Sequence, residues 1–465
     1  MIQIICKDTR YLYNIYHITK AFFPTQEIRQ QVDKEQEPQV QLMLEGGSCF
    51  CINGDDKQDI TGRAYHYLSE TTGKKLAWGM LTGVRPTKLV MQALEQDRQP
   101  SEIVAMLEKN YHVTHEKAVL GLEIAVRERS IISSLDDANG FSLYVGIPFC
   151  PSICSYCSFG AASIHQWRER ATQYLDALCK EIVAIGEAAK GKVLNTIYIG
   201  GGTPTTLEAE QLKRLLDVID QTFFRESLLE YTIEAGRPDS ITKEKLDVIR
   251  SYPVTRISIN PQTMQQKTLD AVGRKHTVEA VKDAFKLARE CGFDNINMDL
   301  IAGLPGEKPE DMQDTLHQIA ELKPDSMTVH ALAIKRAAKY GQEKMVSSLN
   351  DDIDQMIKDS QMTAIQMGLV PYYLYRQKNI AGNFENVGYA KVDKTGIYNI
   401  LIMEEKQTIL AAGAGAMTKI ILPQKVKLEN GKETSLIRIE NVKDIAAYID
   451  RIDEMIARKG EWLWR

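Results

Sequence analysis

The chain has 465 residues, of which 57 are Lys or Arg and 62 are Asp or Glu, giving a formal net charge of -5. This balance excludes a general electrostatic attraction to nucleic acid or anionic lipid, so any anionic ligand must be bound by a local group of basic residues. Hydrophobic residues make up 44% of the sequence, which is typical of a globular protein with about two or three domains.

The N-terminal segment MIQIICKDTRYLYN lacks the basic start, apolar run and cleavage site of a secretory signal. No later stretch approaches about 18 uninterrupted apolar residues, the length that spans a membrane. We therefore expect a cytoplasmic protein, a monomer, with no membrane span and no nucleic-acid partner.

Residues 1–137 predict a separate N-terminal α+β module. Short runs of alternating apolar and polar residues lie around Met1–Cys6 and Gln39–Ile52. Helical patterns follow, the longest from Ser101 to about Ile132. The dipeptide Asn139–Gly140 then predicts a turn, and we place the boundary of the module there.

Residues 138–340 predict an α/β domain. Six β-rich segments, SLYVG, NTIYIG, YTIEA, RISIN, INMDLIAG and SMTVHALA, alternate with longer helical patterns. This alternation predicts right-handed βαβ units with a parallel sheet, and six repeats favour an incomplete (β/α)6 barrel over an eight-stranded one. The active site then belongs at the carboxyl ends of the strands. Residues 341–465 predict a small C-terminal α+β domain, which we expect to act as a lid that binds substrate.

Three of the eight cysteines lie together directly after the first predicted strand. In YVGIPFCPSICSYCSF, Cys150, Cys154 and Cys157 have C-x-x-x-C-x-x-C spacing, which random placement would produce roughly two times in a thousand. Three thiolates on a [4Fe–4S] cluster leave one iron open to the amino and carboxylate groups of a small molecule, and S-adenosylmethionine (SAM) suits that position. The alternatives are a zinc site, which lacks an evident fourth ligand, and buried structural cysteines.

The segment IYIGGGTPT ends the second predicted strand with Gly200, Gly201 and Gly202. Without side chains, the backbone can approach a ligand closely, its amides binding the methionine carboxylate and its carbonyls the amino group. A glycine triplet alone is more often a turn. Its position one strand after the cysteines favours ligand binding.

At these motifs the chain resembles the radical SAM superfamily, and specifically the oxygen-independent coproporphyrinogen III oxidase-like family. The likeness runs from about Ser142 to Ala333 and includes I-E-A, a Gln after the fourth strand, and D-L-I-x-G-L-P. It implies a radical SAM partial barrel that holds a [4Fe–4S] cluster on the three cysteines and cleaves SAM to a 5′-deoxyadenosyl radical.

The resemblance also implies which residues bind SAM. Contacts to the cluster-bound SAM are implied for Tyr144, Gly201 and Glu234, whose carboxylate suits an ammonium group. The family binds a second SAM, so one molecule or two are expected here. The positions that match the second site are Tyr156, Gly202, Thr203, Gln262, Arg274, Asp299 and Ala333. Taken singly, residues such as Asp299 and Gln262 are more often ordinary polar rim residues, and one such as Arg274 is more often a solvated helix charge.

Two departures from the typical oxidases concern the cysteine segment. Those enzymes read V-H-I-P-F-C and carry another cysteine two residues after the third ligand, whereas this chain has Gly146 and Phe159. The chain is similar instead to the coproporphyrinogen dehydrogenase (HemZ-type) branch. That branch also carries motifs like WGMLTGVRPTK and YYLYRQKNIAGNFENVGYA, found here at Trp78–Lys88 and Tyr372–Ala390.

The second of these motifs has two interpretations. Its tyrosines, Tyr372, Tyr373 and Tyr375, offer flat faces to a macrocycle, while Arg376 and Lys378 could pair with propionates. The alternative is an aromatic strand packed in the C-terminal domain with solvated charges. His330 lies near the end of the sixth predicted strand and could approach the expected site, although a lone histidine is more often a core residue.

The family resemblance implies oxidative decarboxylation of coproporphyrinogen III to protoporphyrinogen IX in oxygen-independent haem biosynthesis. The expected partners are this tetrapyrrole and an electron donor such as flavodoxin or ferredoxin. A haem-binding chaperone and a radical SAM enzyme for another tetrapyrrole are the alternatives. Chaperone relatives typically carry an H-N-x-x-Y-W-like segment, and the nearest stretch here, GNFENVGYA, lacks the histidine and the tryptophan.

Overall fold

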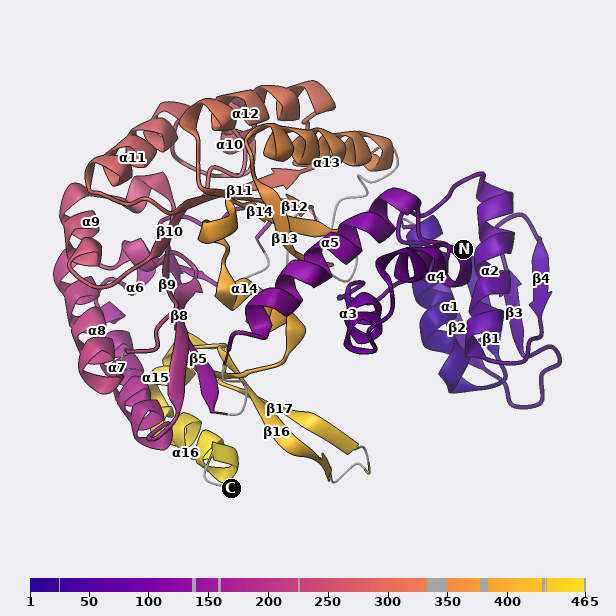
Figure 1. The fold of residues 1–465 in the computed structure, drawn as a ribbon, viewed down its shortest axis with the longest axis horizontal. Helices are drawn as coiled ribbons and strands as arrows, with labels where there is room; N and C mark the ends of the chain where they lie inside the picture. Colours follow the sequence, from indigo (N-terminus) through magenta and orange to yellow (C-terminus); the bar gives the residue numbers. More distant parts are fainter. Residues whose placement is uncertain are drawn as a thin grey trace.

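The six β-rich segments predicted between residues 138 and 340 form neighbouring parallel strands of one curved sheet in the computed structural model (Figure 1). Nearly every residue of these strands is buried, as expected for parallel strands covered on both faces. The strands are β5 (Gly140–Ile147), β8 (Val193–Gly201), β9 (Glu230–Gly236), β10 (Arg256–Ile259), β11 (Ile296–Ala302) and β12 (Ser326–Ala331).

Helices connect these strands and form a ring around the outside of the sheet (Figure 1). Each buries an apolar stripe against the strands; in α8 the stripe is Leu212, Leu215, Leu216 and Ile219, at the spacing of one helix face. The connecting helices are α7 (Ala171–Ala188), α8 (Ala209–Thr222), α9 (Lys243–Arg250), α10 (Gln266–Ala271), α11 (Val278–Glu290) and α12 (Pro309–Leu322).

The C-terminal strands extend the same sheet at both of its edges. On one side, β15 (Thr408–Ala412) pairs in parallel with β5 and continues into the hairpin of β16 (Met417–Lys427) and β17 (Glu433–Glu440). On the other side, β14 (Asn386–Ala390) and β13 (Val370–Tyr375) add antiparallel strands next to β12. The partial barrel is therefore the middle of an 11-stranded sheet.

The C-terminal helices pack around this sheet. The residue range 341–465 contributes α13 (Leu349–Gln366), α14 (Ile397–Glu404), α15 (Ile445–Asp450) and α16 (Ile452–Leu463). Of these, α13 packs on α12, whereas α15 and α16 pack on α7. The limit at residue 340 stays a prediction, because strands from both sides of it share one sheet.

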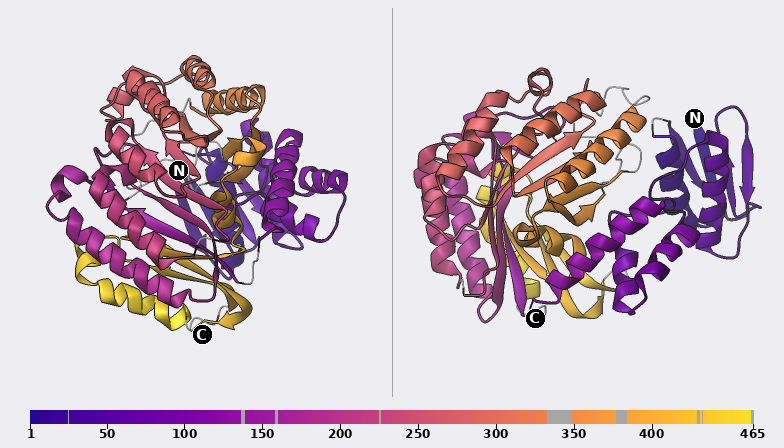
Figure 2. Two further views of the ribbon diagram at one scale, coloured as in Figure 1. Left: turned by 60° about the vertical axis from the view of Figure 1, so that its left-hand side comes forward. Right: turned by 45° about the horizontal axis from the view of Figure 1, so that its top comes forward.

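The N-terminal residues form a small sheet with its own hydrophobic core, set to one side of the barrel (Figures 1 and 2). Its strand order is β2-β1-β3-β4, with two helices packed against each other. The elements are β1 (Ile2–Cys6), α1 (Thr9–Phe22), β2 (Ile28–Val32), β3 (Val40–Met43), β4 (Cys49–Ile52) and α2 (Lys57–Thr72). The sequence patterns did not indicate α1 or β2.

Three further helices lie between the small sheet and the barrel: α3 (Lys88–Glu95), α4 (Pro100–Tyr111) and α5 (His115–Ile132). The single helical pattern predicted from Ser101 to about Ile132 is two helices, because His112 takes a left-handed conformation with φ 56° and ends α4. Side chains of α3 to α5 belong to the large core of the barrel. The predicted boundary at residue 137 therefore stays a prediction as well.

The structure describes residues 1–24, 26–135, 139–157, 160–224, 226–332, 349–376, 384–428, 431 and 433–463. Among these residues, no helix is both long enough and apolar enough to cross a membrane. The α/β class and the partial parallel barrel are confirmed.

Candidate functional site

The three clustered cysteines lie in the loop that follows β5, at the carboxyl end of the strand. Cys150 ends the short strand β6 (Phe149–Cys150), and the Cys157 amide donates to the Cys154 carbonyl at 3.1 Å in the next turn. The Ser155 amide donates to the Val272 carbonyl at 3.0 Å, which fastens this turn to the end of α10. The loop is thus held at both ends by backbone hydrogen bonds and packing.

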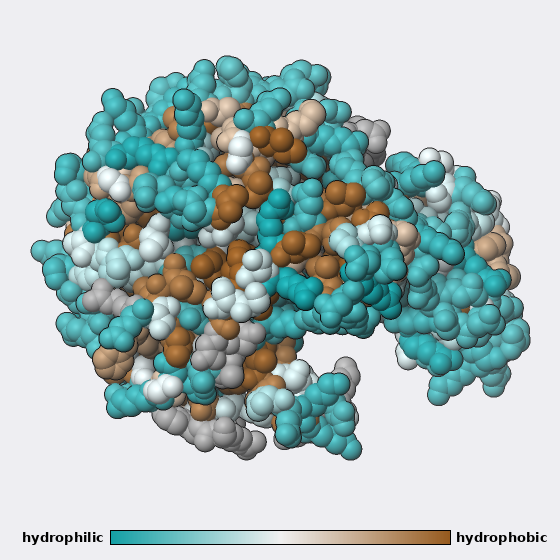
Figure 3. Space-filling view, in the orientation of Figure 1, coloured by the Kyte–Doolittle hydropathy of each residue, from teal (hydrophilic) through white to brown (hydrophobic). Residues whose placement is uncertain are grey.

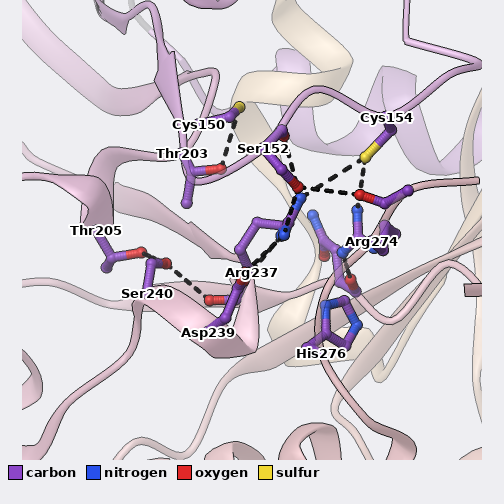
Figure 4. Close-up of polar contacts among 12 residues, drawn as sticks. Cys150, Ser152, Cys154, Thr203, Thr205, Arg237, Asp239, Ser240, Arg274 and His276 are labelled. Atoms are coloured by element: carbon purple, nitrogen blue, oxygen red, sulfur yellow. Dashed lines mark hydrogen bonds and ion pairs between the residues drawn. The ribbon is translucent and has the colours of Figure 1, made fainter. Parts of the chain in front are cut away.

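Two buried arginines point at one of the sulfur atoms (Figure 4). The Arg237 and Arg274 guanidinium groups, each at most 4% exposed, place their Nη1 atoms 3.7 and 3.8 Å from the Cys154 Sγ. The Thr203 hydroxyl donates to the Cys150 Sγ at 3.5 Å. Positive charge and hydrogen-bond donors beside a sulfur atom stabilise a thiolate.

The donor set of this loop consists of three thiol groups. Burial raises the pKa of the Cys150 thiol to about 11, although the hydrogen bond from Thr203 acts in the opposite direction. Within the described ranges, no three His, Cys, Asp or Glu side chains converge closely enough to hold a single metal ion. Cluster ligands bind different irons and can lie farther apart than the ligands of one zinc ion.

The glycine stretch at the end of β8 supports the cysteine loop. The Gly202 amide donates to the Ile147 carbonyl and the Thr203 amide to the Phe149 carbonyl, both at 2.7 Å. A Cβ added at Gly202 would lie 2.5 Å from the Phe149 oxygen, so the loop can approach only because this residue is glycine. The Gly202 and Thr203 amides are therefore already used within the protein, and SAM binding by the glycine stretch stays a prediction.

Glu234 faces the same region from the end of β9, surrounded by three tyrosines. Its carboxylate accepts a short hydrogen bond from the Tyr198 hydroxyl and another from the Gly201 amide. The rings of Tyr198 and Tyr398 stack with centroids 4.5 Å apart, and the Tyr144 ring lies 6.3 Å from each. Burial raises the pKa of Glu234 to about 7. A cation would favour its ionised form.

Most residues assigned to a second SAM fall into two groups joined by Asn260. In one group, the Arg274 guanidinium contacts the Tyr156 hydroxyl at 3.3 Å and donates to the Asn260 carbonyl at 2.5 Å. In the other, the Gln262 amide donates to the Asp299 carbonyl at 2.9 Å, and the Asp299 amide donates to the Asn260 Oδ1 at 3.2 Å. The buried position of Arg274 excludes a solvated helix charge. Ala333 lies outside the described residues.

His330 approaches this second group. Its Nε2 lies 3.9 Å from the Asp299 Oδ2, and its Nδ1 lies 3.2 Å from the Tyr375 hydroxyl. Burial acts to raise the pKa of Asp299, but the contact with His330 and a hydrogen bond from Asn297 leave it below its ordinary value. Asp299 is thus held ionised at the carboxyl end of the barrel.

The tyrosine-rich segment of β13 is largely packed inside the protein. Tyr372 and Tyr373 are 0% and 6% exposed and lie in a buried cluster. Arg376 is 4% exposed and donates to the Leu81 carbonyl at 2.5 Å. The packed-strand interpretation therefore holds for Tyr372 and Tyr373, and Tyr375 is half-buried. The expectation of solvated charges is wrong for Arg376, which is buried, and Lys378 lies outside the described residues.

Three residues of the site were missed in the sequence. Arg237 follows Glu234 by three positions, in YTIEAGRPD, and Tyr198 precedes the glycines in IYIGGGTPT, so both belong to motifs that were recognised. Tyr398 comes from α14, and nothing in its local sequence indicates this position. Only the packing of α14 against β8 brings it to the site.

Comparison with known proteins agrees with this geometry. The model of the Radical SAM superfamily matches residues 144–319. The chain is 41% identical over 413 residues to the oxygen-independent coproporphyrinogen-III oxidase-like protein HemZ of Bacillus subtilis, covering 88% of this chain and 81% of that protein. It is 37% identical over 320 residues to the heme chaperone HemW of the same species, covering 69% and 76%. The solved structure of Escherichia coli coproporphyrinogen III oxidase HemN has a similar fold, with a TM-score of 0.54 at 24% identity over 71% of this chain and 72% of that one.

Proposed function

This chain belongs to the radical SAM superfamily, in its oxygen-independent coproporphyrinogen III oxidase-like family, and we propose that it decarboxylates coproporphyrinogen III oxidatively to protoporphyrinogen IX. The family uses a [4Fe–4S] cluster and SAM. We assign the cluster to Cys150, Cys154 and Cys157. The single observation that carries this assignment is the cysteine loop, fastened to the glycine stretch at the carboxyl end of the parallel strands.

When bound, such a cluster supplies the electron that cleaves SAM reductively. The residues around it have separate tasks. Arg237 and Arg274 place positive charge beside the Cys154 sulfur, which favours thiolate ligation. Glu234, oriented by Tyr198, offers a carboxylate to the ammonium group of SAM. Tyr144 lies beside this carboxylate, at one of the positions that we assign to contacts with SAM.

The second SAM assignment is part of the same proposal. Tyr156, Gly202, Thr203, Gln262, Arg274, Asp299 and Ala333 match the family positions. Asp299 is held ionised and partly exposed, so it suits an ammonium group or a ribose hydroxyl. The contacts of Arg274 with the Cys154 sulfur would place such a molecule next to the first.

Support for a tetrapyrrole substrate comes from the relatives and from the surface. HemZ and HemN are named for coproporphyrinogen oxidation. Hydrophobic residues gather in the middle of the face shown in Figure 3, over the barrel, while the helices at its rim are hydrophilic. An apolar macrocycle suits such a face, and its propionates must meet polar groups at the strand ends.

A haem chaperone is the second candidate, favoured by the similarity to HemW. The absence of an H-N-x-x-Y-W-like segment from the sequence argues against it. The two functions predict different products. A decarboxylase converts the tetrapyrrole and consumes SAM, whereas a chaperone binds haem and releases it unchanged.

The decisive experiment is an anaerobic assay of the reconstituted protein with dithionite, SAM and coproporphyrinogen III, analysed by mass spectrometry. We expect 5′-deoxyadenosine together with a tetrapyrrole that has lost CO₂. If 5′-deoxyadenosine forms while coproporphyrinogen III stays intact, the substrate proposal fails, and titration with haem followed by its absorbance tests the chaperone.

Cys154→Ala tests the ligand assignment. We expect loss of iron–sulfur absorbance and of SAM cleavage, while circular dichroism shows a retained fold. The matched control is Cys291→Ala, a half-buried cysteine at the end of α11, which should keep both properties. A Cys154→Ala protein with its full iron content would refute the assignment.

The remaining expectations concern the electron donor, the location and the oligomeric state of the enzyme. The one-electron chemistry calls for a donor, and we propose flavodoxin or ferredoxin. A cytoplasmic location and a monomeric state remain predictions from the sequence. Dependence of the activity on added flavodoxin tests the donor, and activity in a reduced extract tests compatibility with the cytoplasm. The sedimentation coefficient tests the monomeric state.

A further inference from the structure

The motif WGMLTGVRPTKL in the N-terminal part of the chain has no role in the site described above. Most of its residues from Met80 to Leu89 line a cavity of about 380 Å³, together with Lys57, Gln58 and Thr61 of α2 and Asn14 of α1. This volume is in the range of small-molecule sites. The cavity therefore needs an explanation of its own.

The charges around this cavity are all positive. Lys57, Arg85 and Lys88 line it, and no aspartate or glutamate does. The ammonium groups of Lys57 and Lys88 are exposed, and neither forms an ion pair with a residue of the described ranges. Arg85 is held in place, since it donates to the Met403 carbonyl at 2.5 Å and pairs with Glu405 at 3.2 Å. Two exposed cations in the lining of one cavity, with no ion-pair partner in the described ranges, attract an anion.

The remaining walls are mostly apolar. Met80, Leu81, Leu89 and Tyr111 contribute side chains, with Thr82 and Asn14 as hydrogen-bonding groups. A neighbouring cavity of equal volume, about 380 Å³, shares Gln58 and Met80 with it but has both signs of charge, from Asp56, Asp59 and Arg63. Positive charge without negative charge is thus a property of one cavity and not of the whole module.

We propose that this cavity binds a small amphiphilic anion, with an apolar body in contact with Met80, Leu81 and Leu89 and a carboxylate, sulfonate or phosphate group between Lys57 and Lys88. The cavity wall is joined to the barrel. The carbonyls of Leu81 and Val84 accept hydrogen bonds from the side chain and the amide of Arg376, at 2.5 and 2.7 Å. The bound anion therefore lies against a segment anchored to β13. This inference does not depend on the proposed reaction.

The test uses two fluorescent probes of nearly the same shape. 1-Anilinonaphthalene-8-sulfonate carries a sulfonate, and N-phenyl-1-naphthylamine is its neutral counterpart. Both are titrated into the full chain and into the double variant Lys57→Gln, Lys88→Gln. We expect the sulfonate probe to bind about three- to tenfold more weakly to the variant, because two favourable charge contacts are lost, whereas the affinity of the neutral probe changes less than about twofold.

The matched control is Lys74→Gln, Lys75→Gln, which removes two exposed lysines of the same module that do not line the cavity. This control should bind both probes as the unaltered chain does. A second variant, Gly83→Leu, fills the opening; no atom lies within 4 Å of the position its Cβ would take, so the fold should tolerate it. This variant should weaken the binding of both probes.

The outcomes separate clearly. The proposal is overturned if the sulfonate probe binds the Lys57→Gln, Lys88→Gln variant unchanged, or if the Lys74→Gln, Lys75→Gln control loses affinity equally. It also fails if Gly83→Leu leaves both probes unaffected, because the probes then bind elsewhere. Added salt should weaken the binding of the sulfonate probe more than the binding of the neutral probe.

Discussion

In Glu234, burial favours the protonated carboxyl group, whereas the hydrogen bonds that it accepts favour the ionised form. Its neighbours donate two hydrogen bonds, yet burial still raises the pKa of its carboxyl to about 7 from an ordinary value of 4.5. In the folded protein, the protonated form is therefore favoured up to a pH of about 7. The stability that this form contributes is complete below pH 4.5 and is lost as the pH rises through about 7.

The corresponding prediction is that Glu234→Gln stabilises the cofactor-free protein at pH 8 but not at pH 4.5. Because Glu234 keeps some exposure toward the site, we expect a gain on the order of 1–2 kcal/mol in the free energy of unfolding. Urea unfolding at the two pH values measures it. The same variant should bind SAM more weakly, because the amide cannot pair with an ammonium group.

The control for this prediction is Glu210→Gln at an exposed residue of α8, which should not reproduce the gain in stability at pH 8. Equal stability of Glu234→Gln and the unaltered protein at pH 8 would mean that the carboxyl is better solvated than its position indicates.

The glycine stretch shows how one element positions another. Residues 200–203 end β8, and two of their amides hold carbonyls of the neighbouring chain segment that leads to Cys150. Thr205 continues the arrangement, since its hydroxyl donates to the Ala235 carbonyl at 2.9 Å and so connects the loop to β9. Three adjacent strand ends are thereby held together by short contacts.

Gly202→Ala should disrupt this arrangement. The new Cβ would lie 2.5 Å from the Phe149 oxygen, a backbone atom that cannot move independently, so the cysteine loop must shift. We expect a loss of about 1–3 kcal/mol of stability and impaired cluster assembly. Iron content and urea unfolding measure both effects.

Gly160→Ala is the matched control, because an added Cβ there has no atom within 4 Å although the residue follows the same cysteines. It should assemble the cluster normally. Full iron content in Gly202→Ala would show that the loop can relax without losing its ligand geometry.

At the scale of the whole molecule, a buried ion pair joins the N-terminal helices to the barrel sheet. Lys117 of α5 lies 2.7 Å from Glu385, beside β14, and the Trp78 indole donates to the same carboxylate at 2.7 Å. Burial acts against both charges. Mutual attraction nevertheless leaves the pKa of Lys117 above its ordinary value and that of Glu385 below it. The pair therefore remains ionised.

We predict that Glu385→Gln destabilises this junction strongly. It leaves the Lys117 ammonium, which is 2% exposed, with only the half-exposed Glu116 carboxylate at 3.5 Å. Removal of the buried partner of such a pair costs about 3–5 kcal/mol. Thermal unfolding and amide exchange of α5 provide the measurement. Lys117→Met, Glu385→Gln should recover part of the loss, since no unpaired charge remains.

Glu290→Gln serves as the control, because Lys286 and Glu290 form an exposed pair whose nitrogen and oxygen atoms are 3.9 Å apart. Its removal should change the unfolding temperature little. If Glu385→Gln behaves like this control, the pair contributes nothing to the attachment of α5.

Local patterns were sufficient for the barrel and for the cysteine site. Each of the six parallel strands carries its own apolar run between helical patterns, and the three cysteines lie in eight consecutive positions, so short-range information is enough. The edge strands were not foreseen as part of the same sheet. β15 pairs with β5 across more than 260 residues of sequence, and no local pattern specifies such a partner.

The order of the barrel strands, the cysteine loop, and the position of the glycines and Glu234 at strand ends could be predicted from the sequence, because each depends on residues close together in the chain. Three other features follow from the folded arrangement alone: Arg237 and Arg274 meet at the Cys154 sulfur, Tyr398 stacks on Tyr198, and Tyr372 is packed and not exposed. Contacts of this kind arise when distant elements bury their surfaces against each other, and the positions of the partners follow from packing of the whole chain.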